Sequence, residues 1–147
     1  MSSYEVLEEI CAWTSSAYRQ GRLLYGIIYL YNIHWTHLGG LAMMHLEMFQ
    51  KLCGPSALLN VLLTTTQWSN VNLAAGGRCE KGLRNYSYWG GLVAEGAAIE
   101  RFMGTRESKL ELIDQLMKKE PKPLLIQHQI VDEYISLEET DAGKYIK

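Results

Sequence analysis

The chain has 147 residues, of which 48% are hydrophobic and 20% charged, a composition that excludes disordered and low-complexity proteins and suffices for one hydrophobic core. Its net charge of −2 and its lack of a basic tract exclude a protein that binds nucleic acid through charge alone. No apolar run approaches the roughly 20 residues that cross a bilayer, so we expect no membrane partner.

The cysteines point to a reducing compartment. Cys11, Cys53 and Cys79 are widely spaced and form no C-x-x-C pair, so we interpret them as reduced thiols that pack in the protein. The N-terminus lacks the basic and apolar regions of a signal peptide. Both observations favour a cytoplasmic protein.

Helices and strands are predicted to alternate along the chain. In chain order they are a helix over residues 4–20, a strand over Leu23–Tyr31, a loop over 32–40, a helix over 41–53, a strand over Asn60–Thr66, a short helix over 78–85, an aromatic loop over 86–91, a strand over Ala97–Met103, and helices over 108–119 and 123–135. This order predicts an α/β protein in which a short parallel sheet of about three strands is flanked by helices. We expect a single domain over 1–147, with residues 120–147 as a C-terminal helical extension.

Local patterns refine some of these elements. Capping boxes are predicted at Ser2–Glu5 and at Ser108–Glu111, where the helices over 4–20 and 108–119 begin. The strand over Leu23–Tyr31 is apolar on both faces, which is typical of a strand buried on both sides of a parallel sheet.

Charge is almost absent from one long segment. From Leu23 to Gly77 the only charged residues are Glu47 and Lys51. Such a segment cannot form most of the surface of a soluble monomer, so either the rest of the chain or a partner must cover it.

Several segments resemble one known family. They are residues 26–30 (GIIYL), 39–40 (GG), 48–54 (MFQKLCG), 60–68 (NVLLTTTQW), 126–127 (IQ) and 131–133 (VDE). These segments resemble P-loop GTPase-like proteins of mushroom-type fungi, which are distant relatives of septins and of immune-associated GTPases. The resemblance implies a partial P-loop NTPase-like three-layer fold, that is, a truncated G domain that begins at the helix after the phosphate-binding half.

The motifs that handle nucleotide are missing from this resemblance. No G-x-x-x-x-G-K-[ST] sequence is present, so the phosphate-binding loop, its lysine and its magnesium-binding hydroxyl are lacking. Residues 65–68 (TTQW) stand where the family reads guanine, and they lack the carboxylate that pairs with the base. We therefore expect a degenerate, nucleotide-independent protein that is not a GTPase and uses no cofactor.

The same resemblance predicts a partner. The strand over Leu23–Tyr31 would lie in the middle of a complete G-domain sheet, so one of its edges lacks a neighbour here. We expect a homodimer formed through this strand and the apolar helices over 4–20 and 41–53, by edge pairing or by helix exchange. A separate polypeptide that supplies the missing half is the alternative.

A candidate ligand site lies at the carboxyl ends of the predicted strands, where open α/β sheets bind their ligands. Its residues follow the first and the second strand: Tyr31, Asn32, His34, Trp35, His37, Thr65, Thr66 and Trp68. Aromatic rings beside a few polar groups suit an apolar or aromatic small molecule, although the same residues could line a dimer contact or the core. His37 or His34 with Tyr31 would be the acid–base pair of a cofactor-free isomerase or cyclase, whereas we favour a binding protein without catalysis. A metal site from His34, His37 and His45 is not predicted, because Glu47 is the only acidic residue nearby.

Overall fold

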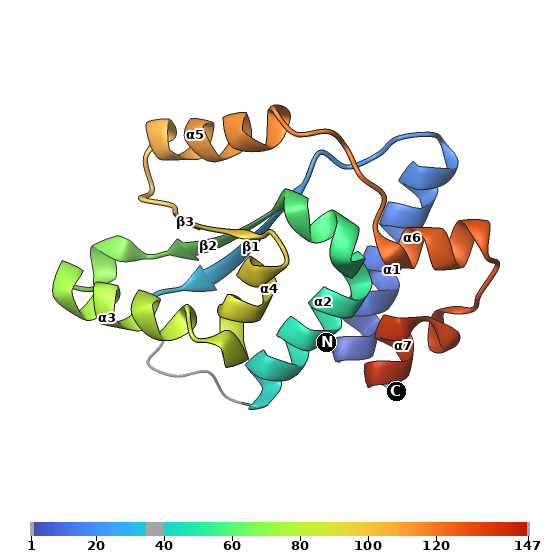
Figure 1. The fold of residues 1–147 in the computed structure, drawn as a ribbon, viewed down its shortest axis with the longest axis horizontal. Helices are drawn as coiled ribbons and strands as arrows, with labels where there is room; N and C mark the ends of the chain where they lie inside the picture. The colour runs from blue at the N-terminus through green and yellow to red at the C-terminus, as the bar shows by residue number, and fades with distance from the viewer. Residues whose placement is uncertain (1, 35–39, 147) are drawn as a thin grey trace.

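Three parallel strands form the centre of the molecule (Figure 1). β1 (Ile27–Asn32), β2 (Val61–Thr66) and β3 (Ala98–Arg101) pair in the order β1-β2-β3, with Ile27 opposite Val61. Because parallel strands need crossover connections, the chain returns through helices between successive strands. The predicted α/β fold, a short parallel sheet flanked by helices, is confirmed.

The structure describes residues 2–34 and 40–146. Within these ranges the α-helices are α1 (Ser3–Arg19), α2 (Gly40–Ala57), α3 (Leu73–Leu83), α4 (Gly91–Ala94), α5 (Arg106–Met117), α6 (Leu125–Gln127) and α7 (Asp141–Ile146). Short 3-10 turns span Leu58–Asn60, Trp68–Asn70 and Leu137–Glu139, and π-helical turns span Tyr86–Gly90 and His128–Asp132. α1 packs against α6 and against α7, and both of these helices also contact α2 (Figure 1).

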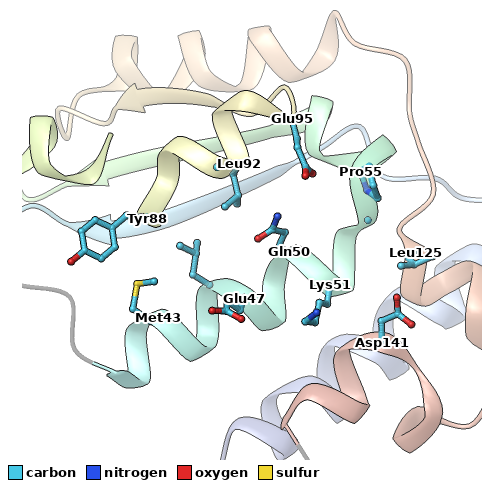
Figure 2. Close-up of a pocket in the computed structure, with 13 residues that line it drawn as sticks. Met43, Glu47, Gln50, Lys51, Pro55, Tyr88, Leu92, Glu95, Leu125 and Asp141 are labelled. Atoms are coloured by element: carbon cyan, nitrogen blue, oxygen red, sulfur yellow. The ribbon is translucent and has the colours of Figure 1, made fainter. Parts of the chain in front are cut away.

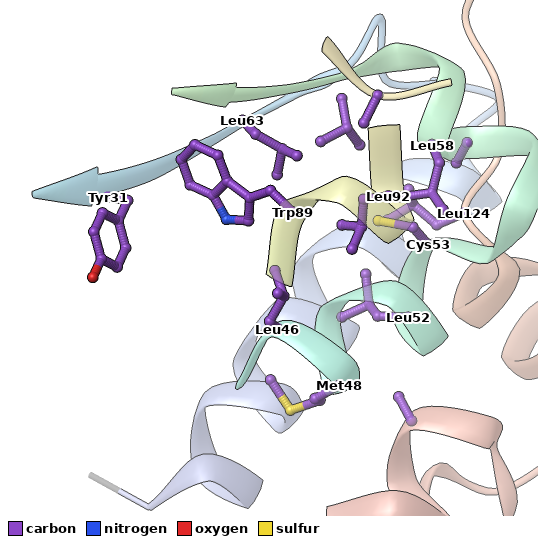
Figure 3. Close-up of a cluster of buried hydrophobic side chains, with 14 of the residues drawn as sticks. Tyr31, Leu46, Met48, Leu52, Cys53, Leu58, Leu63, Trp89, Leu92 and Leu124 are labelled. Atoms are coloured by element: carbon purple, nitrogen blue, oxygen red, sulfur yellow. The ribbon is translucent and has the colours of Figure 1, made fainter. Parts of the chain in front are cut away.

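The two faces of the sheet bury different helices. On one side, which we call the α5 face, Ile28, Leu62 and Ala98 pack against Leu112 and Leu116 of α5. The opposite side, the α2 face, packs against α2 and α4 and holds most of the core. Figure 3 shows part of that core, with Tyr31, Leu46, Met48, Leu52, Cys53, Leu58, Leu63, Trp89, Leu92 and Leu124 labelled. The alternation of side chains along each strand therefore separates the two layers.

The first strand differs from its prediction in length and in burial. β1 begins at Ile27 rather than at Leu23, because β2 is preceded by the turn at Leu58–Asn60 and offers no extended backbone to pair with residues 23–26. The peptide N–H of Lys122 donates instead to the carbonyl of Leu24. β1 was also expected to be buried on both faces, yet most of its residues are half-exposed, and only the central strand β2 is buried almost throughout.

Helix boundaries confirm some of the predicted caps and correct others. The Ser2 hydroxyl caps α1 by accepting a hydrogen bond from the peptide N–H of Glu5, as predicted. The cap of α5 is Thr105 rather than Ser108, because Ser108 is already in the helix and its own N–H donates to the Thr105 hydroxyl. The predicted helix over 123–135 is instead α6 followed by the π-helical turn.

None of the helices within the two described ranges combines the length and the hydropathy that crossing a membrane requires.

Gly26 provides a test of how tightly the sheet is packed where β1 begins. A Cβ atom at this position would lie 2.4 Å from the carbonyl oxygen of Asn60 and 2.5 Å from Cδ2 of Leu116. We expect Gly26→Ala to lower the free energy of unfolding by about 2 kcal/mol in urea titrations, since one of these neighbours is backbone that cannot move aside. Gly77→Ala is the control, because Gly77 lies within α3 with open space around it, and alanine there should add up to about 1 kcal/mol. Equal stability of Gly26→Ala and the wild type would contradict the packing described here.

Candidate functional site

The carboxyl end of β2 holds the predicted threonines and Trp68 in a defined hydrogen-bonded arrangement. The Trp68 indole N–H donates to the Thr65 hydroxyl over 2.9 Å, and the Thr65 hydroxyl donates to the Glu100 carbonyl over 3.3 Å. The Thr66 hydroxyl donates to the carbonyl of Tyr31 over 3.3 Å, which ties β1 to β2. Thr65 and Trp68 are buried, so these groups hold the end of the sheet together.

The site residues that were predicted at the end of β1 do not lie together in the structure. Tyr31 is buried on the α2 face, where its ring meets the ring of Trp89 edge-on with centroids 5.8 Å apart (Figure 3). The side chain of Asn32 accepts a hydrogen bond from the peptide N–H of His34, and the His34 side chain is exposed. Trp35 and His37 lie outside the described residues. Tyr31 pairs with Thr65 in the sheet, so the side chains of Tyr31 and Thr66 project to opposite faces of the sheet.

Trp68 also connects α3 to the sheet. The Arg101 guanidinium lies over the Trp68 ring, 4.2 Å from its centroid, and forms two hydrogen bonds to the Glu80 carboxylate at 2.8 and 2.9 Å. On α3, a Cβ atom at Gly76 would come within 2.5 Å of the ring, so only glycine fits there. The hydrogen bonds from Arg101 hold the pKa of the Glu80 carboxyl below its ordinary value.

A shallow groove of about 300 Å³ opens on the α5 face at the same end of the sheet. It brings together two predicted site residues, Thr66 and Trp68, with side chains that sequence reasoning had not included. The other lining residues are Leu30, Gln67, Ser69, Phe102, Met103 and Gly104. Alternation along a strand puts Leu30 and Tyr31 on opposite faces of the sheet, but nothing local in the sequence shows that Phe102 and Met103 reach the same place as Leu30.

A second groove, of about 410 Å³, lies between α2, α4 and α7 and was not predicted (Figure 2). Its charged lining residues are Glu47, Lys51, Glu95 and Asp141. The Lys51 ammonium lies 5.5 Å from the centroid of the Tyr145 ring, and the carboxylate of Asp141 accepts a hydrogen bond from Gln129. Lys51 therefore joins α2 to α7, whereas Asp141 bonds within the C-terminal segment.

His45 and Cys53 contribute to the packing of the helices rather than to a reactive site. The His45 ring shares a hydrogen bond of 2.9 Å with the Ser3 hydroxyl, which joins α2 to α1. Burial raises the pKa of the Cys53 thiol to about 12, so this thiol is no nucleophile. In the part of the chain that the structure describes, no three His, Cys, Asp or Glu side chains are placed to hold a metal ion.

The two edges of the sheet differ in chemistry. β3 forms one edge, is four residues long and carries Glu100 and Arg101, features that discourage further pairing. β1 forms the other edge, is six residues long and has no charge, no proline and no β-bulge in its pairing with β2. Leu30 in its second half is 62% exposed. Within residues 2–34 and 40–146, no strand pairs with this outer side of β1.

The direction of the backbone groups of β1 follows from one hydrogen bond. The N–H of Ile33, the residue after β1, donates to the carbonyl of Thr66 on β2. Because successive residues of a strand alternate in direction, the N–H and C=O groups of Tyr29 and Tyr31 also point to β2. Those of Ile28, Leu30 and Asn32 point away from the sheet. The outer edge thus presents three donors and three acceptors to whatever lies beside it.

Comparison of the chain with models of protein families, with curated proteins and with solved structures gave no match. The relationship to P-loop GTPase-like proteins therefore stays a prediction from the sequence.

The ion pair between Glu80 and Arg101, next to Trp68, predicts that the stability of the protein depends on pH. Because the pKa of Glu80 is lowered from its usual 4.5 in the folded protein, the stability that its charge contributes is present above that value. It is lost as the pH falls through the lowered pKa. We expect Glu80→Gln to reduce the free energy of unfolding at pH 7 by up to about 1 kcal/mol, since Arg101 is partly exposed and its attraction is screened by solvent.

The difference between Glu80→Gln and the wild type should shrink when unfolding is measured at progressively lower pH. Glu111→Gln, at an exposed carboxylate on α5, is the control and should change the stability by less than about 0.5 kcal/mol at any of these pH values. A difference for Glu80→Gln that stays constant down to acid pH would show that the carboxylate charge contributes nothing.

Proposed function

We propose that this protein is a nucleotide-independent interaction protein of the cytoplasm that works as a homodimer joined through the outer edge of β1. The observation that carries the proposal is the contrast between the two sheet edges. The edge at β3 is short and charged, whereas β1 is longer, uncharged and bears an exposed leucine. An edge of this kind is a template for another strand.

Apolar side chains next to the edge support the same proposal. Leu23 and Leu24 precede β1 and line a groove of about 360 Å³ together with Trp13 of α1. Trp13 and Leu23 are both exposed, as is Tyr25. Clusters of exposed large apolar side chains mark interaction sites on soluble proteins, so α1 is expected to contribute to the contact beside β1.

Nucleotide independence rests on the chemistry of the strand ends. The end of β2 is occupied by Thr65 and Trp68, which bond to each other and leave no carboxylate to read a guanine base. The charged groups nearest to it, Arg101 and Glu80, are paired with each other. A rise in melting temperature on addition of GTP with Mg²⁺ would contradict this part of the proposal.

A second candidate function is the binding of an apolar or aromatic small molecule, with or without catalysis. The observation that favours it is the groove that Leu30, Thr66 and Phe102 help to line, which combines apolar walls with a hydroxyl group. Native mass spectrometry that found a retained small molecule on a monomer would favour this function over the homodimer.

The mass in solution tests the homodimer. We expect light scattering at micromolar concentration to give twice the 16.7 kDa of one chain. Leu30→Lys should return the protein to a monomer, because a lysine at the centre of the edge would be buried without a partner. Leu73→Lys is the matched control, since Leu73 is 67% exposed at the start of α3 and away from β1, and it should leave the dimer intact.

Circular dichroism would confirm that both variants keep their helices. A wild-type mass equal to one chain would contradict the homodimer, and a dimer that survives Leu30→Lys would contradict its formation through the edge of β1.

A further inference from the structure

We propose that the partner of β1 is a second copy of the chain in antiparallel register, with the two-fold axis at Leu30 and the flank of α5 from each copy seated over the β1 edge of the other. This inference rests on the homodimer proposed above and adds the register, the second contact surface and the side chains that form it.

The hydrogen-bonding groups of the edge select the register. The outward groups belong to Ile28, Leu30 and Asn32, and they lie symmetrically about Leu30. In an antiparallel pair, residues whose groups face the partner exchange both of their hydrogen bonds. If Leu30 lies opposite Leu30 of the partner subunit, Ile28 lies opposite Asn32 of the partner subunit. Every outward donor and acceptor between Ile28 and Asn32 is then used, whereas a shift in either direction leaves some of them unpaired.

The charge pattern favours an identical partner. A side chain close to a two-fold axis meets its own copy, so a charged residue there would be repelled. Residues 23–33 include no charged side chain, and the residue on the proposed axis is an exposed leucine. Two copies of the β1 edge can therefore pair without bringing like charges together.

α5 offers a second apolar surface on the side of β1. Leu112 and Leu116 of α5 face the sheet, and Glu107 and Glu111 on one flank line a groove together with Glu100 of β3. At 100° per residue, the opposite flank carries Ile113 and Met117, which must therefore point toward the β1 side of the sheet. Ile113 is 43% exposed and Met117 is 57% exposed, so residues 2–34 and 40–146 cover this flank only in part.

The course of α5 explains how that flank would meet the partner. Ser108 near the start of α5 bonds to the carbonyl of Arg101 at the end of β3, whereas Leu116 lies against Gly26, just before β1. The helix therefore crosses the sheet diagonally, and it leaves the second half of β1 uncovered at Leu30. A two-fold axis at Leu30 brings the first half of the partner's strand, and with it the end of the partner's α5, beside this uncovered half. Ile113 of the partner subunit then lies toward the groove that Leu30 and Phe102 line.

Disulfide trapping tests the register. In a variant whose half-buried Cys79 is replaced by serine, Leu30→Cys should form a covalent dimer on mild oxidation, since directly opposed residues have Cα atoms about 5.5 Å apart. Ile28→Cys alone should not, because its opposite residue is Asn32. A mixture of the Ile28→Cys and Asn32→Cys proteins should again give a covalent dimer.

The contribution of α5 has its own variant. Ile113→Lys should raise the dissociation constant about tenfold or more, since it places a charge in an apolar contact. Leu110→Lys is the control on the same helix, because Leu110 is 49% exposed but points away from the sheet, and it should leave the dissociation constant unchanged.

The two proposals fail separately in these experiments. A dimer by light scattering that neither forms the Leu30→Cys crosslink nor responds to Ile113→Lys would overturn the register and the α5 contact while the homodimer stands. A monomer under all conditions, including one that binds an unrelated chain at β1, would overturn both.

Discussion

The unpaired backbone of β1 is the constraint on which the rest of this structure depends. A strand cannot leave its peptide groups without partners unless water reaches them, and an exposed edge that is also apolar attracts other strands. At β3 the molecule limits this tendency through a short strand and through charged side chains, one of which, Arg101, is held by Glu80 and Trp68. At β1 it has none of these protections, and it combines an uncharged strand with an exposed leucine and exposed side chains on α1 and α5.

The chemistry at the strand ends is consistent with a sheet that binds protein rather than phosphate. Thr65 and Trp68 occupy the end of β2, but their polar atoms satisfy each other and the backbone of β3. Tyr31 packs against Trp89 on the α2 face, so this aromatic side chain, which was predicted to line a pocket, lies in the core. The polar groups in this region therefore hold the strands and α3 together, and exposed apolar side chains such as Leu30 and Ile113 lie at the edge of β1 and on α5.

The sequence predicted the fold well where a segment carries its own pattern. β2 followed from an uncharged run rich in β-branched residues, and α1 from its cap and its helical spacing. The start of β1 did not, because a strand extends only as far as its neighbour, and the turn before Val61 is not visible in residues 23–26. The sequence also predicts Ser108 as the cap of α5, whereas in the structure Thr105 is the cap and the Ser108 hydroxyl donates to the carbonyl of Arg101 at the end of β3.

The candidate site was harder to predict than the fold, since it depends on faces that only the folded sheet defines. Residues 65–68 were placed correctly at a strand end, yet Leu30, Phe102 and Met103 join Thr66 from separate segments. One signal was available in the sequence: Ile113 and Met117 form a second apolar stripe on α5, apart from the stripe that faces the sheet. Such a stripe on a helix that already buries one face indicates a second contact.

Hydrogen exchange at the amides of β1 tests the central claim most directly. Tyr29 and Tyr31 point to β2 and should exchange slowly at every protein concentration. The account predicts that Ile28, Leu30 and Asn32 exchange rapidly in dilute protein and become protected as the concentration rises, because a second strand then covers them. Rapid exchange of these three amides at all concentrations, including those at which the other two are fully protected, would contradict it.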